Sequence, residues 1–234
     1  MWSFVGIAGQ WPDGAWATTS HPAGRTGFTK LWRWDGKRWV HRQSTRESHF
    51  FDFIQPWVGG RQLAVEQAGM MFDARLVVIT GDKSAAVPEI ERTKDPQSVC
   101  MTNFRVEAFD TLPSGEVVAA GLRCDADMNA ALAVQRWSPG QKRGVLESLP
   151  SAAQDDKTSV AITGLALRSP SDIGVAGRLT TWNRATDNST DSTYLAHFDG
   201  KRWQEVASKI PGMVASLTTG ADRACRVAVA RPIR

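Results

Sequence analysis

Hydrophobic and polar residues alternate along this chain in short stretches, and Gly, Pro, Asp and Ser separate one stretch from the next. A period of two is typical of half-buried β-strands, and almost no segment has the 3.6-residue period of an amphipathic helix. The pattern therefore predicts an all-β chain. The expected strands, mostly in groups of four, span residues 2–9, 14–20, 28–34 and 38–43; 50–58, 61–67, 74–80 and 85–90; 103–110, 116–122, 130–137 and 144–149; 160–167, 172–179, 193–198 and 202–207; and finally 213–219 and 223–230.

A short turn motif recurs between the third and fourth strands of these groups. Residues 34–39 (WDGKRW) and 198–203 (FDGKRW) differ only in their first residue, and residues 137–143 (WSPGQKR) are a looser copy. Asp-Gly is a strong signal for a hairpin turn, so the motif is interpreted as structural. Its defining residues are Trp34, Asp35, Gly36, Trp39, Asp199, Gly200 and Trp203.

Recurrence of a four-stranded unit predicts the blades of a β-propeller, in which neighbouring units bury each other's apolar faces. The expected units are residues 1–46, 47–95, 96–152, 153–210 and 211–234, forming a single propeller domain or a fragment of one. A jelly roll or sandwich would not explain a turn motif at matched places. The fifth unit has two expected strands, and we expect another chain or residues outside this sequence to complete it.

The strand at 172–177 (DIGVAG), followed by a variable segment and then by 195–203 (LAHFDGKRW), resembles the repeats of secreted bacterial β-propellers with aromatic-x-Gly-x-x-Trp hairpins. Asp-Gly-x-x-Trp is also similar to the Asp-box of sialidase-type propellers, although Asp35 and Asp199 directly precede glycine and no Ser stands two residues before them. These resemblances imply a propeller fold and an extracellular or cell-envelope location, and they leave the ligand open.

Composition narrows the possible partners. The chain has 234 residues, 42% of them hydrophobic and 22% charged, which is ordinary for a globular protein. Its 28 basic and 24 acidic residues are scattered, so we expect no nucleic-acid partner. No apolar run reaches the roughly 18 residues of a membrane span. The first residues, Met-Trp-Ser-Phe, lack the charged start and apolar run of a signal peptide.

The three cysteines leave two alternatives open. Cys100 and Cys124 are expected at the same end of two adjacent strands, where they form either a disulfide in an oxidising compartment or two separate buried thiols. Cys225 has no evident partner and is interpreted as a small core residue.

No motif indicates a catalytic site, a metal site or a cofactor. The four histidines lack the close spacing of zinc ligands, and His197 is interpreted as a partly buried strand residue. Asp125 and Asp127 are spaced like calcium ligands but lack the following Gly and distal Glu of an EF-hand. Solvated loop charge is the alternative interpretation of these two carboxylates.

Three long connections between second and third strands, at 21–27, 123–129 and 180–192, are expected at one end of a propeller. The sequence therefore predicts a non-catalytic binding or scaffold module that recognises a protein or glycan there. A polysaccharide hydrolase or lyase and a structural subunit of a larger assembly are the alternatives. The candidate binding residues are His21, Arg25, Asp125, Asp127, Trp182 and Arg184.

Overall fold

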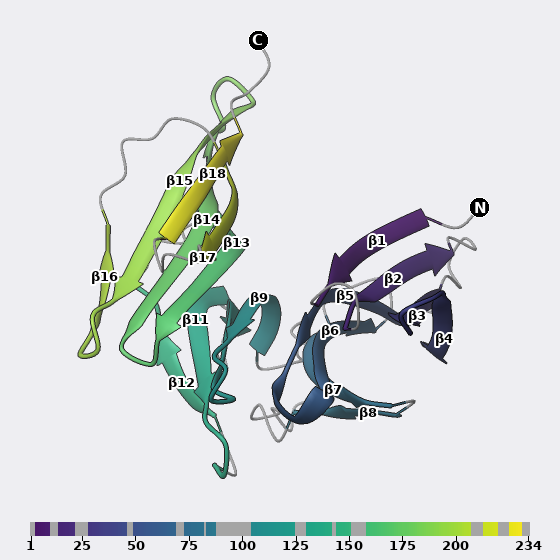
Figure 1. Ribbon diagram of the computed structural model, residues 1–234. Helices are drawn as coiled ribbons and strands as arrows, with labels where there is room; N and C mark the ends of the chain where they lie inside the picture. Colours follow the sequence, from purple (N-terminus) through teal and green to yellow (C-terminus); the bar gives the residue numbers. More distant parts are fainter. Residues whose placement is uncertain are drawn as a thin grey trace. The chain divides into compact units, whose positions relative to one another are not determined.

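The computed structural model describes residues 3–9, 14–21, 28–45, 49–68, 73–81, 83–87, 104–124, 130–141, 144–150, 158–206, 213–219 and 225–230. The regular elements among these residues are β-strands and one 3-10 turn, η2 (Val58–Gly60), and no α-helix occurs among them (Figure 1). The all-β prediction is confirmed. The chain divides into two compact units, Met1–Arg105 and Val106–Arg234, which are described separately below.

Unit 1 contains two four-stranded antiparallel meanders. The first consists of β1 (Ser3–Ala8), β2 (Trp16–His21), β3 (Phe28–Trp34) and β4 (Trp39–Ser44). The second consists of β5 (His49–Pro56), β6 (Gln62–Ala68), β7 (Asp73–Thr80) and β8 (Lys83–Ala86). One parallel pair, Phe28 with His49, joins β3 to β5. The apolar core between the two meanders consists of Trp16, Leu31, Phe51, Ile54, Ala64, Val77 and Ile79.

Unit 2 contains two further meanders and a two-stranded sheet. The first meander consists of β9 (Phe104–Thr111), which begins at the boundary between the units, β10 (Val117–Cys124), β11 (Ala130–Trp137) and β12 (Val145–Ser148). The second consists of β13 (Thr158–Ser169), β14 (Asp172–Asn183), β15 (Asn188–Phe198) and β16 (Trp203–Glu205). The last sheet pairs β17 (Met213–Thr219) with β18 (Cys225–Ala230).

The β13–β16 sheet is covered on both faces. Its large side chains, among them Ile173, Tyr194 and Phe198, join the core shared with β9–β12. Its opposite face carries Ala166 and Ala176, which pack against Leu217 of β17. Because this second face is lined by small residues, the backbone of β17 approaches it closely. A Cβ atom added at Gly164 would lie 2.6 Å from the backbone nitrogen of Leu217.

A register shift recurs in the first strand of several sheets. It falls between Phe4 and Gly6 in β1, between Asp52 and Gln55 in β5, between Ile162 and Gly164 in β13, and between Val214 and Ser216 in β17. Bulges of this kind bend and twist a strand locally. The repeated sheets therefore share a backbone irregularity, although the residues skipped by the register have no type in common.

The two Asp-Gly turns have matching geometry. Oδ1 of Asp35 accepts hydrogen bonds from the N–H groups two and three residues further on (2.9 and 2.8 Å), and Oδ1 of Asp199 does the same (2.9 and 3.0 Å). These N–H donors hold the pKa of both exposed carboxyls below the ordinary value. Gly36 and Gly200 take the left-handed backbone that the turn needs, with φ of 95° and 90°.

The aromatic residues that flank each turn form a cross-strand pair. The ring centroids of Trp34 and Trp39 lie 5.5 Å apart, and those of Phe198 and Trp203 lie 5.3 Å apart. Both distances are within the range of favourable aromatic contacts, so each pair strengthens the hairpin that its turn closes.

Two segments differ from the sequence-based prediction. Residues 180–192 were expected to be a loop, but β14 continues to Asn183 and β15 starts at Asn188, so most of the segment is a hairpin. It is polar on both faces, which removes the alternation that marks a half-buried strand, while its Thr and Trp residues favour extended backbone. In addition, β8 begins at Lys83, which pairs with Thr80 of β7, rather than at residue 85.

We predict that Gly164→Ala destabilises unit 2 because the new methyl group would push β17 away from β13. The expected loss is about 1–3 kcal/mol in the free energy of unfolding, measured by chemical denaturation. Ser159→Ala, at an exposed position of the same strand, is the control and should change stability by less than about 0.5 kcal/mol. Equal stability of the two variants would show that the close approach of β17 is not a constraint.

Candidate binding surface

Hydrogen bonds between β9 and β13 fix the relative direction of the two meanders in unit 2. Glu107 Oε2 accepts from the N–H of Ile162 (2.8 Å), and Asp110 Oδ2 accepts from the N–H of Leu167 (2.9 Å). Residue numbers rise together along both strands, so β9 and β13 run in the same direction. The β10–β11 and β14–β15 connections therefore leave unit 2 at the same end.

The same relation holds in unit 1. The parallel pair of Phe28 with His49 places the start of β3 beside the start of β5. The antiparallel pairing of β2 with β3 puts the end of β2 beside the start of β3. In the same way, the end of β6 lies beside the starts of β5 and β7. The β2–β3 and β6–β7 connections are therefore at the same end of this unit.

A charged cluster lies at this end of unit 1. Glu66 is almost fully buried, and its carboxylate accepts hydrogen bonds from Nε (2.8 Å) and an Nη (2.6 Å) of Arg75. The other carboxylate oxygen lies 3.1 Å from Nδ1 of His49. Both oxygens are thus engaged, which lowers the cost of burying the carboxylate. The cluster ties the starts of β5 and β7 to the end of β6.

The β14–β15 hairpin is the most exposed element at the corresponding end of unit 2. It pairs without a register shift as far as Asn183 with Asn188, whereas the pairing of β13 stops at Thr158 with Thr181. All described residues from 181 to 192 are exposed, so the hairpin forms an arm that extends past its own sheet (Figure 1). We call residues 178–193 the hairpin arm.

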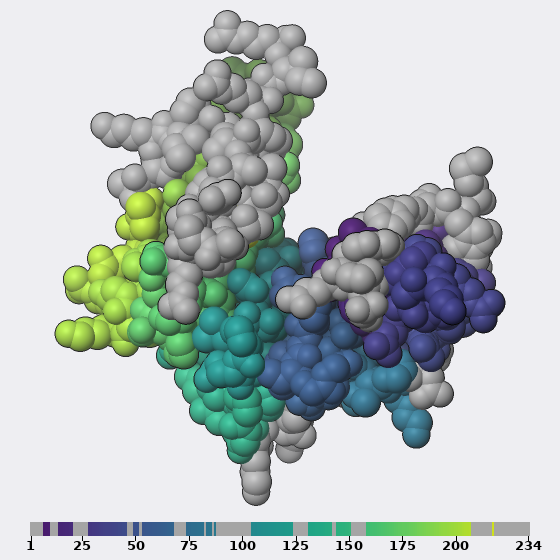
Figure 2. Space-filling model, in the orientation of Figure 1, coloured from purple at the N-terminus to yellow at the C-terminus, as the bar shows by residue number. Residues whose placement is uncertain are grey.

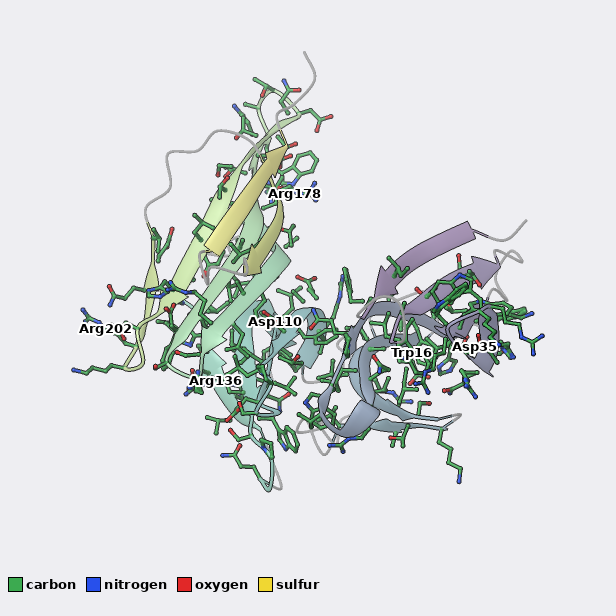
Figure 3. The ribbon with its side chains drawn as sticks, in the orientation of Figure 1. Trp16, Asp35, Asp110, Arg136, Arg178 and Arg202 are labelled. Atoms are coloured by element: carbon green, nitrogen blue, oxygen red, sulfur yellow. The ribbon has the colours of Figure 1, made fainter. Side chains whose placement is uncertain are left out.

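One face of the hairpin arm combines an aromatic ring with polar groups. Alternation along the paired strands puts Trp182 on the same face as Arg178, Thr180 and Asp191. Trp182 is 49% exposed, and the hydroxyl of Thr180 donates to Oδ1 of Asp191 (2.7 Å). Figure 3 shows Arg178 on β14, where the arm begins. The Trp182 ring thus shares a face with a guanidinium, a hydroxyl and a carboxylate.

The structure places some of the predicted binding residues. Trp182 and Arg184 lie on the hairpin arm, both exposed. His21 ends β2 at the β2–β3 connection, and its side chain is not described. Arg25, Asp125 and Asp127 lie outside the described residues. Of the predicted disulfide, Cys124 ends β10 and Cys100 also lies outside the described residues, so the pairing stays a prediction.

The sequence interpretation missed Arg178, Thr180 and Asp191. A signal for them exists: a hairpin centred on the turn at 184–187 puts every second residue from Trp182 on one face. The turn itself is set by Asn183, whose Oδ1 accepts from the N–H of Ala185 (3.0 Å). Asn and Asp favour such turns because their short side chains bond to nearby backbone groups.

The carboxylates of Glu107 and Asp110 on β9 accept hydrogen bonds from backbone N–H groups. Besides its bond from Leu167, Asp110 accepts the N–H of Thr111 on Oδ1 (2.8 Å). Burial raises the pKa of the Asp110 carboxyl above the ordinary 3.8, although these two N–H donors oppose the shift. Glu107 and Asp110 supply partners to N–H groups of β13 that face away from β14, and they are placed for edge protection rather than for proton transfer.

The described part of the chain offers neither a cluster of metal ligands nor a membrane-spanning helix. No group of three or more His, Cys, Asp or Glu side chains there is placed to hold a metal ion. No helix in that part has the length and apolar character needed to cross a membrane.

Comparison with known proteins gives distant structural similarities. No family model matches the chain, and a search of curated proteins found no match. A mannose phosphorylase from Leishmania mexicana, MPT-4, solved with phosphate ion, is 8% identical with a TM-score of 0.47, over 97% of this chain and 79% of that one. The extracellular domain of BT4673 from B. thetaiotaomicron is 7% identical with a TM-score of 0.36, over 97% and 37%. Similarity at this level carries no functional argument.

We predict that Asp110 makes unit 2 less stable as the pH rises. Because the carboxyl has a raised pKa in the folded state, its favourable contribution is complete below the unfolded-state pKa near 3.8 and is lost as the pH rises through the folded value. The difference in unfolding free energy between the wild-type protein and Asp110→Asn should therefore fall with rising pH. Denaturation between about pH 3 and 7 measures it.

Asp199→Asn is the matched control with the opposite sign. The pKa of Asp199 is lowered, so its contribution is present at neutral pH and is lost as the pH falls through the folded value. The difference between the wild-type protein and this variant should rise with pH. Parallel curves for the two variants would contradict the proposed effect of burial on Asp110.

Proposed function

We propose that the protein is a non-catalytic binding module that recognises a glycan through the hairpin arm. The observation that carries the proposal is the exposed Trp182 ring, which shares one face of a fully paired hairpin with Arg178, Thr180 and Asp191. The propeller fold, the extracellular or envelope location and the scaffold role are part of this proposal and rest on the repeated turn motif and its resemblance.

The chemistry of this face suits a sugar. The apolar C–H face of a pyranose ring stacks on an indole, which offers a large flat area and loses little side-chain entropy on binding. Hydroxyl groups at the ring edge accept from a guanidinium and donate to a carboxylate. Because the hairpin is paired along its length, these groups are ordered before the ligand arrives, which lowers the entropic cost of binding.

A protein ligand and a polysaccharide-cleaving activity are the competing hypotheses. A protein interface would centre on the same Trp and Arg side chains, which are common anchors at such surfaces. A hydrolase or lyase would need two free carboxylates, or a carboxylate with His or Tyr, near one another. Two described carboxylates do lie beside a histidine, Glu66 beside His49 and Asp172 beside His197, but each of them also pairs with an arginine. Glu107 and Asp110 bond to backbone N–H groups instead.

We predict that Trp182→Ala weakens glycan binding at least about tenfold, which corresponds to roughly 1.4 kcal/mol of lost stacking. The measurement is a glycan array followed by calorimetry with the best ligand. Trp182→Phe keeps an aromatic face and should retain most of the affinity. Both substitutions are at an exposed position, so the melting temperature should be unchanged.

The controls separate the three hypotheses. Lys37→Ala changes an exposed residue in the β3–β4 turn and should leave glycan affinity unchanged. A partner protein that binds the wild-type chain but not Trp182→Ala, with no glycan bound, would favour the protein ligand. Release of shorter sugars from the array ligand would overturn the non-catalytic proposal.

A further inference from the structure

Basic side chains gather at one end of unit 1. Because β3 and β5 run in the same direction, the β3–β4, β5–β6 and β7–β8 connections lie at the end opposite the β2–β3 connection. The described basic residues of these connections and of the strand ends beside them are Arg33, Lys37, Arg38, Arg61 and Lys83. We call these five residues the basic end. They come from separate parts of the chain, so the sequence alone does not indicate the group.

Two arginines of the basic end lie over indole rings. The guanidinium carbon of Arg33 is 5.9 Å from the centroid of the Trp16 ring, and that of Arg61 is 4.1 Å from the centroid of the Trp57 ring. Both indoles are buried, so they support the guanidinium groups from a fixed position. Nε of Arg61 also donates to the carbonyl oxygen of Val58 (3.0 Å), which further orients this side chain.

No carboxylate in the described part of the chain pairs with Arg33 or Arg61. Other supported arginines do have such a partner, as Arg136 has in Glu147. The described acid at this end is Asp35, whose Oδ1 accepts two N–H bonds within its own turn and whose Oδ2 lies 3.8 Å from Arg38. The charges of the two stacked arginines are therefore not neutralised by described side chains.

The excess of positive charge does not depend on which residues are described. Two further acids of these connections, Asp13 and Asp82, lie outside the described residues. With both ionised, five basic residues still outnumber three acidic ones. Lys37, Arg38 and Lys83 are exposed. In the space-filling view, the violet-blue residues of the β3–β4 region lie at the surface (Figure 2).

We propose that the basic end binds a stretch of an acidic polysaccharide through its carboxylate or sulfate groups. A guanidinium whose flat face rests on an indole keeps its N–H edge free, and that edge can make two parallel hydrogen bonds to a pair of anionic oxygens. Lysines add charge with no fixed geometry, which fits the repeated anionic groups of a polymer. This site belongs to unit 1 and goes beyond the glycan site proposed for the hairpin arm of unit 2.

A nucleic acid is the competing polyanion, and the described indoles do not favour it. Proteins hold single strands by stacking successive bases on exposed aromatic rings. Trp16 and Trp57 are buried, with guanidinium groups over their rings. Trp39 is 36% exposed but packs against Trp34, so it offers one ring rather than a row. Charge without a row of stacking rings is more suitable for a sugar polymer than for bases.

The test measures the binding of fluorescently labelled oligogalacturonate, which has one carboxylate per sugar, to the 234-residue protein by fluorescence anisotropy. We expect binding that weakens at least about tenfold when the salt concentration rises from about 50 to 300 mM, because salt screens exposed charges. The fully methyl-esterified oligosaccharide has the same backbone without the charge and should not bind. Dextran sulfate, with neutral dextran as its control, tests sulfate in place of carboxylate.

Matched charge variants locate the site. Arg33→Gln combined with Arg61→Gln keeps a planar polar group over each indole and should weaken binding at least about tenfold. Lys201→Gln combined with Arg202→Gln removes the same charge from an exposed turn of unit 2 and should bind like wild type. Lys37→Gln combined with Arg38→Gln, at exposed turn positions, should weaken binding at least about threefold. It keeps the test valid if the loss of the stacked arginines lowers the melting temperature.

Four results would overturn the proposal. They are equal binding of charged and esterified sugar, no binding of either anionic polymer at about 1 mM, equal affinity of the unit 1 and unit 2 variants, and tighter binding of single-stranded DNA than of both polymers. Trp182→Ala separates this site from the hairpin arm, because it should leave oligogalacturonate binding unchanged. If Trp182→Ala abolished that binding while the Arg33 and Arg61 variant retained it, the acidic sugar would belong to the arm and the basic end would be excluded.

Discussion

Four short antiparallel strands cannot bury both of their faces by themselves, and this constraint organises the structure. An isolated meander of this size leaves apolar side chains in water unless another sheet covers them. In unit 1 the two meanders cover each other, with Leu31 and Phe51 fully buried between them. In unit 2 the β13–β16 sheet meets β9–β12 through large side chains and β17 through small ones. Stability therefore resides between sheets as much as within them.

In this arrangement, the backbone N–H groups at the free edge of each first strand still need hydrogen-bond acceptors. Backbone N–H groups there point away from their own sheet, and β13 meets this need with carboxylates from the neighbouring β9. In unit 1, Oγ1 of Thr29 on β3 accepts from the N–H of Phe51 on β5 (3.3 Å). Different residue types serve one purpose, because a buried backbone donor without a partner is costly.

The sequence predicted the strands better than the surface. Alternation predicted a strand that overlaps each described strand, although β8 begins two residues earlier than expected and β14 and β15 run further. The turns at Asp35 and Asp199 were predictable because they depend only on local hydrogen bonds. The hairpin arm was not predicted because neither of its faces is buried. Alternation of hydrophobic and polar residues indicates a strand only where one face is buried. Of the candidate residues, Trp182 and Arg184 lie together on the arm. Arg178 and Asp191 required the hairpin register, and the Glu66–Arg75 pair required contact between β6 and β7.

Gln43 on β4 and Glu147 on β12 each bond to the outer strand of a neighbouring meander, and the chemical difference between them has a consequence for assembly. A chain built from similar units risks pairing a sheet with the wrong neighbour while it folds. Gln43 meets a small hydroxyl at Ser84, whereas Glu147 also pairs with Arg136 and receives the bulky indole of Trp203. Exchanging the neighbours would bring Glu147 and its partner Arg136 against Ser84, and it would leave the indole N–H of Trp203 without the carboxylate that accepts from it. A mispaired meander would therefore lose a side-chain hydrogen bond that the correct pairing makes between outer strands.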